Sequence, residues 1–341
     1  MITTKVINLS HLWLYFNFDP CYFNKNSLPE EYDFTKFKLM EQIEYILVRI
    51  LYGIVGLIPF SYGGIFARVL AFLTRRIFLY RRRVVRSNLR RAFPTCDRPA
   101  LKKIEKDVYL NFMMLWIEVL QNFRLSKEFF ARHFTIYNWD VVEQARQQNK
   151  GIIFLTCHFG NYEWLGGYIG HTLGDFYVIS QRIKNPRVNT FLQGTRAKTR
   201  ARLIDRKEGS KKGVELLLEQ KNLGIVTDQD ARARGIFVDF FGIPASTAVG
   251  TAYFHLRTGA AMIFCTSIRK KWGEFELHFE RLPDFYGQAI KDRTLYQITK
   301  LHTALLEKWV RAYPGQYFWT HRRWKSKPTV EQQAQYAANK E

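Results

Sequence analysis

The sequence predicts an α/β fold in which helices flank a mostly parallel central sheet, with a membrane-associated helical segment on its N-terminal side. From residue 151 onward, short apolar or β-branched runs alternate with longer stretches of helical periodicity. That alternation is typical of parallel strands connected by helices that cover the sheet. The 341 residues, 47% of them hydrophobic, are enough for one large α/β domain with additions.

Ahead of the sheet, two apolar runs, "YILVRILYGIVGLIPF" (45–60) and "IFARVLAFLTRRIFLY" (65–80), flank a short "SYGG" break. A transmembrane helix needs roughly 20 mainly apolar residues. The first run is shorter and carries Arg49, and the second carries three arginines. Together they predict an amphipathic hairpin that lies in the membrane interface. A single tilted span over residues 43–64 remains an open alternative.

The rest of the chain divides into a helical stretch and an alternating one. Residues 95–150 have apolar positions at helical spacing and predict helices. Beyond them, strands are expected at 151–157, 176–180, 223–227, 236–240, 261–268 and 274–281, and helices at 161–171, 186–204, 210–220, 247–258 and 291–312.

Composition separates the chain into four parts. Residues 1–39 lack a long apolar core and a small-residue cleavage site, so they predict a poorly ordered extension rather than a signal peptide, with Met40 as an alternative start. Residues 40–94 are the membrane-associated segment, 95–326 the α/β domain and 327–341 a polar tail. Four dispersed cysteines argue against a structural zinc site or a disulfide framework and suit a reducing compartment.

The chain is strongly basic, with 52 Lys+Arg against 30 Asp+Glu and a formal net charge of +22. Such a charge attracts nucleic acid, anionic lipid or an acidic protein without choosing among them. The segment "RRIFLYRRRVVRSNLRR" (75–91) contains eight arginines and no acid. Because it adjoins the apolar runs, it favours the cytoplasmic face of a membrane over a solvated helix face or a nucleic-acid arm.

The stretch "GIIFLTCHFGNYEWLGG" (151–167) carries the strongest candidate site. Its apolar run predicts a strand buried on both faces, and His158 stands at the carboxyl end, where α/β proteins tend to bind ligands. Asn161 is a natural N-cap, which places Glu163 in the first turn of the next helix. Residues five apart on one helix lie about 140° apart around its axis. His158 and Glu163 can therefore meet only if the chain turns between them.

Such a turn would create acid–base chemistry. A carboxylate on one ring nitrogen fixes the tautomer of a histidine and supports its charged form, so that the other nitrogen can accept a proton from a hydroxyl. Backbone N–H groups near Gly160 and Asn161 could hold a developing oxyanion. The alternative is structural: Glu163 serves the helix dipole and His158 is only hydrogen-bonded. Cys157 is expected to be a packing residue rather than a nucleophile.

The H-x-x-x-x-E motif resembles the signature of the lysophospholipid acyltransferase superfamily, and the wider sequence resembles one of its branches, the late acyltransferases of lipid A biosynthesis (the lauroyl/myristoyl transferase family). Five blocks carry this resemblance in order over roughly residues 40–326. They are "RRRVVRSNLRRAFP" (81–94), "HFGNYEW" (158–164), "ISQRIKNPRVN" (179–189), "TDQDARARGIFVDFFGIPASTAVG" (227–250) and "YPGQYFWTHRRWK" (313–325).

This resemblance implies a glycerolipid acyltransferase-like fold and an O-acyltransferase at the cytoplasmic face of the inner membrane. The enzyme would move a fatty acyl chain from acyl–acyl carrier protein to a hydroxyl of a lipid A precursor, by direct attack without an acyl-enzyme. His158 would be the general base and Glu163 its orienting acid. No metal, cofactor or nucleic acid is implied; the expected partners are the acyl carrier protein, the lipid acceptor and the membrane.

Further residues receive roles by the same resemblance, each beside a plainer alternative. Arg182 would stabilise the oxyanion or an acceptor phosphate, or be an ordinary surface arginine. Asp228 and Gln229 end another strand and would line the same crevice, or simply terminate that strand. Arg323 would bind acceptor phosphates or lipid headgroups. Trp319 and Trp324 would lie at the membrane interface.

Two other functions are considered. The same chemistry could act on another membrane glycolipid, such as a phosphatidylinositol mannoside, or on an amino-acid lipid. A membrane- or nucleic-acid-binding protein without catalysis could use the basic helix and the apolar hairpin, but that function leaves the order of the five blocks unexplained.

Overall fold

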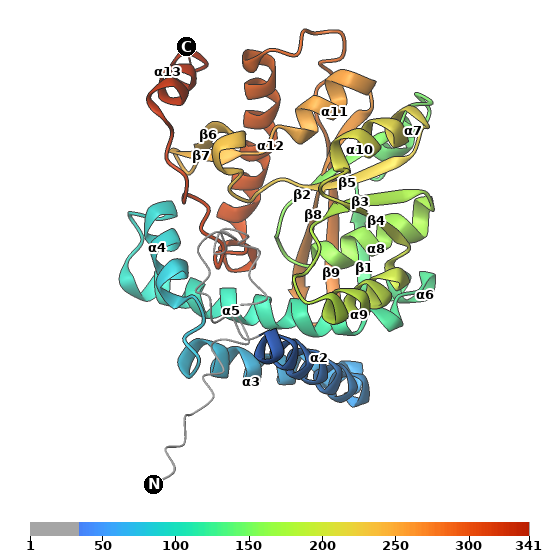
Figure 1. The fold of residues 1–341 in the computed structure, drawn as a ribbon, viewed down its shortest axis with the longest axis vertical. Coiled ribbons are helices and arrows are strands. Elements are labelled where there is room, and N and C mark those ends of the chain that lie inside the picture. Colours follow the sequence, from blue (N-terminus) through green and yellow to red (C-terminus); the bar gives the residue numbers. More distant parts are fainter. Residues whose placement is uncertain (1–33, 341) are drawn as a thin grey trace.

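The computed structural model describes residues 34–340, and Figure 1 shows a central sheet with helices on both sides. The seven strands have the order β1-β9-β8-β2-β5-β3-β4, and all neighbours pair in parallel except β8 and β9. The predicted α/β class with a mostly parallel sheet is therefore confirmed. The strands are β1 Phe134–Tyr137, β2 Ile152–Thr156, β3 Phe176–Ser180, β4 Ala201–Asp205, β5 Asn222–Val226, β8 Ala261–Lys271 and β9 Glu274–Arg281.

Strand β2 lies in the middle of the sheet and is buried on both faces. Its alternate residues contribute to two separate cores, Ile153 and Leu155 to one and Ile152 and Phe154 to the other. The first core is closed by helices α5, α10, α11 and α12, and the second by α6, α7 and α8. These helices are α5 Arg98–Leu120, α6 Lys127–His133, α7 Asp140–Arg146, α8 Tyr162–Leu173, α10 Gly209–Leu218, α11 Gly250–Thr258 and α12 Asp292–Ala312.

Every strand expected from the sequence is present within a few residues, but three others were missed. The expected helix over 186–204 ends early: α9 (Pro186–Arg196) is followed by a short 3-10 turn, and Arg200 takes a left-handed φ of 58° before β4 begins. Strands β1 and β4 are the two edges of the sheet. Edge strands are short and bear polar side chains, so they lack the apolar run that marks a central strand.

The third missed strand belongs to a separate antiparallel hairpin of β6 (Ile236–Phe240) and β7 (Ile243–Thr247). Phe241 and Gly242 form its two-residue turn, and both have positive φ, as the favoured hairpin turns require. Pro244 lies just beyond this turn, within β7.

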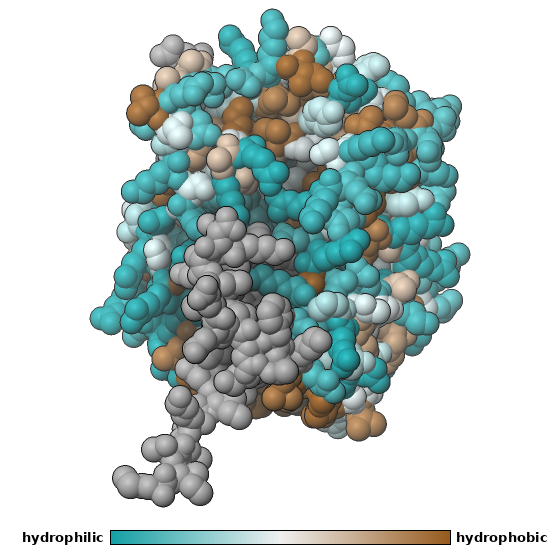
Figure 2. Space-filling model, viewed as in Figure 1, coloured by the Kyte–Doolittle hydropathy of each residue, from teal (hydrophilic) through white to brown (hydrophobic). Residues whose placement is uncertain are grey.

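The N-terminal helices α2 (Phe34–Leu57) and α3 (Gly63–Arg76) form the lower edge of the molecule in Figure 1. Among the described residues, no single helix is long and apolar enough to cross a membrane; α2 and α3 together pass that test as a pair bent by 111°. The two helices leave many large apolar side chains in solvent, and Figure 2 shows hydrophobic residues along the same edge. They are Leu39, Met40, Ile43, Ile46, Leu47, Ile50, Leu51, Ile54, Leu57, Ile65, Val69 and Phe72.

Helices are present near both ends of the described residues. Helix α2 begins at Phe34, ahead of Met40, and the rest of the expected N-terminal extension lies outside the described residues. The polar tail contains a helix, α13 (Val330–Ala338), which starts with a capping box between Thr329 and Gln332.

Candidate active site

The sheet register brings His158 and Asp228 together. Strands β2 and β5 are parallel neighbours, and Thr156 pairs with Val226 at their carboxyl ends. His158 and Asp228 each stand two residues beyond this pair, so they emerge side by side at the same edge of the sheet. The pairing continues past the strands, because the Thr227 N–H donates to the Thr156 carbonyl at 3.2 Å.

His158 makes two hydrogen bonds to one oxygen of Asp228. Its Nδ1 lies 2.8 Å from Oδ1, and its backbone N–H donates to the same oxygen at 3.1 Å. The Asp228 side chain is only 3% exposed. Burial alone would raise the pKa of Asp228, but the charge and the two hydrogen bonds of His158 hold that pKa below its usual value. An ionised Asp228 requires the proton of a neutral His158 to be on Nδ1.

The other ring nitrogen of His158 is the one available for chemistry. The Gln229 side-chain amide lies 3.4 Å from Nε2, an arrangement in which the amide donates to an unprotonated nitrogen. The ring of Tyr162 packs edge-on against the imidazole and Phe318 lies on another side. The imidazole is therefore held from several directions, with Nε2 as a proton acceptor. Asp228 and Gln229 do reach the crevice of His158, as the sequence predicts.

A narrow pocket of about 10 Å³ reaches His158, enough for roughly one water molecule. Its lining is largely apolar and comes from α5 and from the closing segment of the chain, which we define as residues 317–321. The lining includes Val108, Phe112, Leu115, Tyr317 and Phe318. A ligand with a long apolar chain would have to displace these side chains in order to reach the imidazole.

The contact that the sequence predicts between Glu163 and His158 is not formed: the two side chains share no hydrogen bond or ion pair. Both carboxylate oxygens bond to the guanidinium of Arg196, at 2.5 and 3.1 Å. The reason is local: Asn161 caps α8 by accepting from the Trp164 N–H, so Glu163 projects sideways toward the end of α9. The ring of Tyr162 occupies the space beside the imidazole instead.

The turn between β2 and α8 is built as predicted but uses its polar groups differently. Gly160 has a φ of 56°, and a Cβ there would lie 1.7 Å from the Ser267 carbonyl oxygen, so no other residue fits. Its N–H donates to the Gln316 carbonyl at 3.0 Å. Gly160 therefore has no free N–H to offer to an oxyanion. An oxyanion role for the backbone N–H of Asn161 stays a prediction. The Asn161 side chain is likewise engaged, as cap acceptor and as donor to Glu118 at 2.7 Å.

Behind this turn lies a buried charged network that sequence reasoning missed. Glu118 on α5 is fully buried and accepts from the side chains of Asn161 and Arg269, the latter through Nε at 3.0 Å and also through Nη2. The backbone of Arg269 exchanges two hydrogen bonds with the Gln316 side chain, at 2.8 and 2.9 Å. Gln316 in turn accepts from Gly160. The ion pair thus fixes both residues that follow Phe159.

The arginines and tryptophans with predicted ligand roles divide into buried and exposed ones. Arg323 is 1% exposed and donates to the Ser246 carbonyl at 2.7 Å, so it cannot reach a headgroup as expected. Trp319 and Trp324 are core residues, not interface residues. Arg182 is 72% exposed and pairs with Asp205 at 2.5 Å. Its role toward a substrate stays a prediction.

Two other titratable groups, His321 and Cys157, lie near His158 and Asp228. Burial lowers the pKa of His321 to about 4, and its Nε2 accepts from the Asp230 N–H at 3.1 Å. Burial also raises the pKa of the Cys157 thiol well above its usual value, with Asp228 adding to the effect. The burial of Cys157 agrees with its expected packing role. Within residues 34–340, no three His, Cys, Asp or Glu side chains are arranged to hold a metal ion.

Comparison with known proteins identifies the family of the chain. Residues 34–326 match the family profile described as bacterial lipid A biosynthesis acyltransferase. The chain is 26% identical over 274 residues to the lipid A biosynthesis palmitoleoyltransferase of Escherichia coli, which covers 77% of this chain and 87% of that protein. It is 24% identical over 261 residues to the lipid A biosynthesis lauroyltransferase of the same organism, covering 75% of this chain and 83% of that protein.

A more distant relative has a differently named activity. The phosphatidylinositol mannoside acyltransferase of Mycobacterium tuberculosis is 24% identical over 166 residues, which covers 46% of this chain and 52% of that protein. All three relatives are named for the transfer of acyl groups. The family match spans most of the chain, and the chain is therefore an acyltransferase of the bacterial lipid A biosynthesis acyltransferase family.

Proposed function

We propose that this enzyme transfers a fatty acyl chain from acyl–acyl carrier protein to a hydroxyl group of a lipid A precursor. The observation that carries the chemistry is the state of His158: a buried carboxylate, Asp228, holds Nδ1 at 2.8 Å, and Nε2 remains as an acceptor. That is the arrangement required of a general base that removes a proton from a hydroxyl.

The reaction needs no acyl-enzyme. Nε2 of His158 takes the proton of the acceptor hydroxyl while the hydroxyl oxygen attacks the thioester carbonyl carbon. The tetrahedral intermediate then collapses, the C–S bond breaks, and the imidazolium returns its proton to the departing sulfur. Asp228 stabilises the imidazolium between these two steps without taking the proton itself.

Glu163 acts in this mechanism as a positioning residue. Its two hydrogen bonds to Arg196 tie the first turn of α8 to the last turn of α9. Since Tyr162 precedes Glu163 and packs on the imidazole at 4.9 Å between ring centroids, the pair supports one wall of the site. In this mechanism the H-x-x-x-x-E motif contributes the base, His158, and a positioning residue, Glu163. The orienting acid is Asp228, which follows β5.

The enzyme would work on the cytoplasmic face of the inner membrane. The apolar side chains exposed on α2 and α3 form a surface that could enter the headgroup region of a bilayer. The formal charge of +22 favours the negatively charged cytoplasmic leaflet and an acidic carrier protein.

The acceptor is tested by comparing the lipids of a strain that lacks the gene with those of its parent. Mass spectrometry should show lipid A lighter by one acyl chain in the deleted strain, and restoration by the gene on a plasmid. Unchanged lipid A together with an altered glycolipid of another kind would replace the proposed acceptor. The likeness to the phosphatidylinositol mannoside acyltransferase makes such a glycolipid the second candidate.

A further inference from the structure

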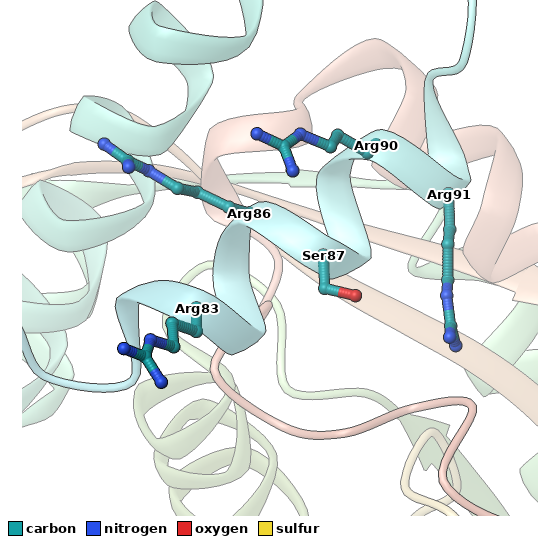
Figure 3. Close-up of a pocket in the computed structure, with 5 residues that line it drawn as sticks. All are labelled: Arg83, Arg86, Ser87, Arg90 and Arg91. Atoms are coloured by element: carbon teal, nitrogen blue, oxygen red, sulfur yellow. The ribbon is translucent and has the colours of Figure 1, made fainter.

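Helix α4 (Arg82–Ala92) has two faces of different character. Val85, Leu89 and Ala92 are buried, whereas the opposite face exposes Arg83, Ser87, Arg90 and Arg91. These four follow the i, i+4, i+7 and i+8 spacing of one helical face. Figure 3 shows that they project from α4 together with Arg86, with Ser87 between Arg83 and Arg91. These five residues line an open pocket of about 450 Å³. We call the exposed side of α4 formed by Arg83, Ser87, Arg90 and Arg91 the α4 arginine face.

Among the described residues, this face has no counter-charge of its own. Glu105 on α5 is the carboxylate beside α4, and it is 3% exposed and pairs with Arg75, Arg82 and Arg86. Within residues 34–340, Arg83, Arg90 and Arg91 form no ion pair. Neighbouring like charges on one helix are unfavourable. An uncompensated cluster of this kind therefore indicates an acidic partner.

The inner face of α4 is bonded to the segment that covers the active site. The Asn88 side-chain amide donates to the carbonyls of Trp319 and His321, at 2.8 and 2.6 Å. In the same closing segment, Phe318 donates its N–H to the His158 carbonyl at 3.0 Å. A partner on α4 would thus lie directly outside the residues that line the narrow pocket at His158.

We propose that the α4 arginine face is the docking surface for the acidic carrier protein that delivers the acyl thioester, an inference that rests on the proposed function. From Arg83 to Arg91 the face is about 12 Å long, from the rise of 1.5 Å per residue. That length matches a row of carboxylates on a partner helix better than a single phosphate. Guanidinium groups pair with carboxylates through two parallel hydrogen bonds, and opposite charges accelerate association.

The test is a triple charge reversal, Arg83→Glu, Arg90→Glu and Arg91→Glu, in the full-length protein. All three side chains are exposed, so the fold should be kept. The matched control reverses three exposed charges, one just before α12 and two within its first half: Lys291→Glu, Arg293→Glu and Lys300→Glu. Both variants lose the same net charge. Initial rates are measured with two donors, the acyl carrier protein thioester and the corresponding acyl-pantetheine thioester, which lacks the protein.

The α4 variant should show a KM for the carrier protein raised at least roughly tenfold, the low end of what charge steering supplies, with kcat unchanged. Its rate with acyl-pantetheine, and all rates of the control, should equal those of the wild type. An unchanged KM, or an equal loss with both donors, overturns the docking site. If the α4 variant loses binding to anionic lipid vesicles while its KM for the carrier protein is unchanged, the face recognises lipid headgroups and the docking site is also overturned. If the wild type uses neither thioester, the proposed function itself fails.

Discussion

His158 and Asp228 form the centre of the site because two parallel strands end at the same level. The sequence identifies each residue as the polar end of a strand, but their contact depends on β2 and β5 being neighbours. Chain order does not reveal that neighbourhood, since β3, α9, β4 and α10 intervene. The same reason hides Arg196 as the partner of Glu163. Local sequence located His158 and the capped turn, whereas only the tertiary pairing located Asp228, the acid that we propose orients it.

Two isosteric substitutions distinguish the roles of the two acids. Asp228→Asn should lower kcat by roughly 10²–10⁴-fold, because an amide cannot support the imidazolium at Nδ1. Glu163→Gln should lower kcat less, because the oxygen of the new amide can still accept from one donor of Arg196. Steady-state kinetics of both purified variants measures this difference. A larger loss in Glu163→Gln than in Asp228→Asn would return the orienting role to Glu163.

At the scale of elements, the sequence predicts central strands well and peripheral ones poorly. Strands β2, β5 and β8 have continuous apolar runs, as expected for strands covered on both faces. Strands β1 and β4 have four and five residues with mixed burial, so each resembles the end of an adjoining helix. The buried pair of Glu118 and Arg269 was missed for another reason. Its members belong to α5 and β8, far apart in the chain, and neither stands in a motif.

This ion pair connects α5 and β8 to the turn at Gly160, so its loss should destabilise the fold. Glu118→Leu leaves the buried guanidinium of Arg269 and the amide of Asn161 without their acceptor. Removing one partner of a buried pair costs about 3–5 kcal/mol. Chemical denaturation should show that loss in the free energy of unfolding.

The matched control for this substitution is Glu274→Gln. It breaks an exposed pair with Lys271 and should cost less than about 1 kcal/mol. Equal small losses in both variants would contradict the importance assigned to the buried network.

At the scale of the whole molecule, burial of neutral histidines makes stability depend on pH. Burial and the nearby Arg323 lower the pKa of His302 to about 3, and burial lowers the pKa of His321 to about 4, against 6.5 for a free side chain. Between these values the unfolded chain binds protons that the folded protein does not. The contribution of these two neutral histidines to the free energy of unfolding is therefore fully present above pH 6.5. It falls as the pH drops toward 4, by about 1.4 kcal/mol per pH unit for each proton.

Urea denaturation at several pH values measures this dependence. His302→Gln should reduce the slope between pH 6.5 and 4 by up to one proton, whatever its effect on stability at neutral pH. A slope identical to that of the wild type would show that His302 is protonated in the folded state.

The apolar surface of α2 and α3 is the side of the molecule that would face lipid in the proposed orientation. Ile50 and Ile54 are 53% and 45% exposed and lie one helical turn apart on α2. Ile50→Asp with Ile54→Asp should weaken sedimentation with anionic vesicles at least roughly tenfold, since each buried isoleucine contributes about 1.5–3 kcal/mol. Leu218→Asp, at an exposed apolar position on α10, is the control and should bind normally. Equal binding by the wild type and both variants would contradict this orientation.

The central claim is that His158 of this enzyme removes the proton from a lipid hydroxyl during direct acyl transfer. The most direct measurement offers purified wild-type protein and the His158→Ala variant an acyl carrier protein thioester together with a tetra-acylated lipid A precursor, and follows the lipid by mass spectrometry. The wild type should give a product heavier by one acyl chain. The variant, still folded by circular dichroism, should be slower by at least roughly 10²–10⁴-fold. Transfer at the wild-type rate by His158→Ala would contradict the role of His158 as the general base.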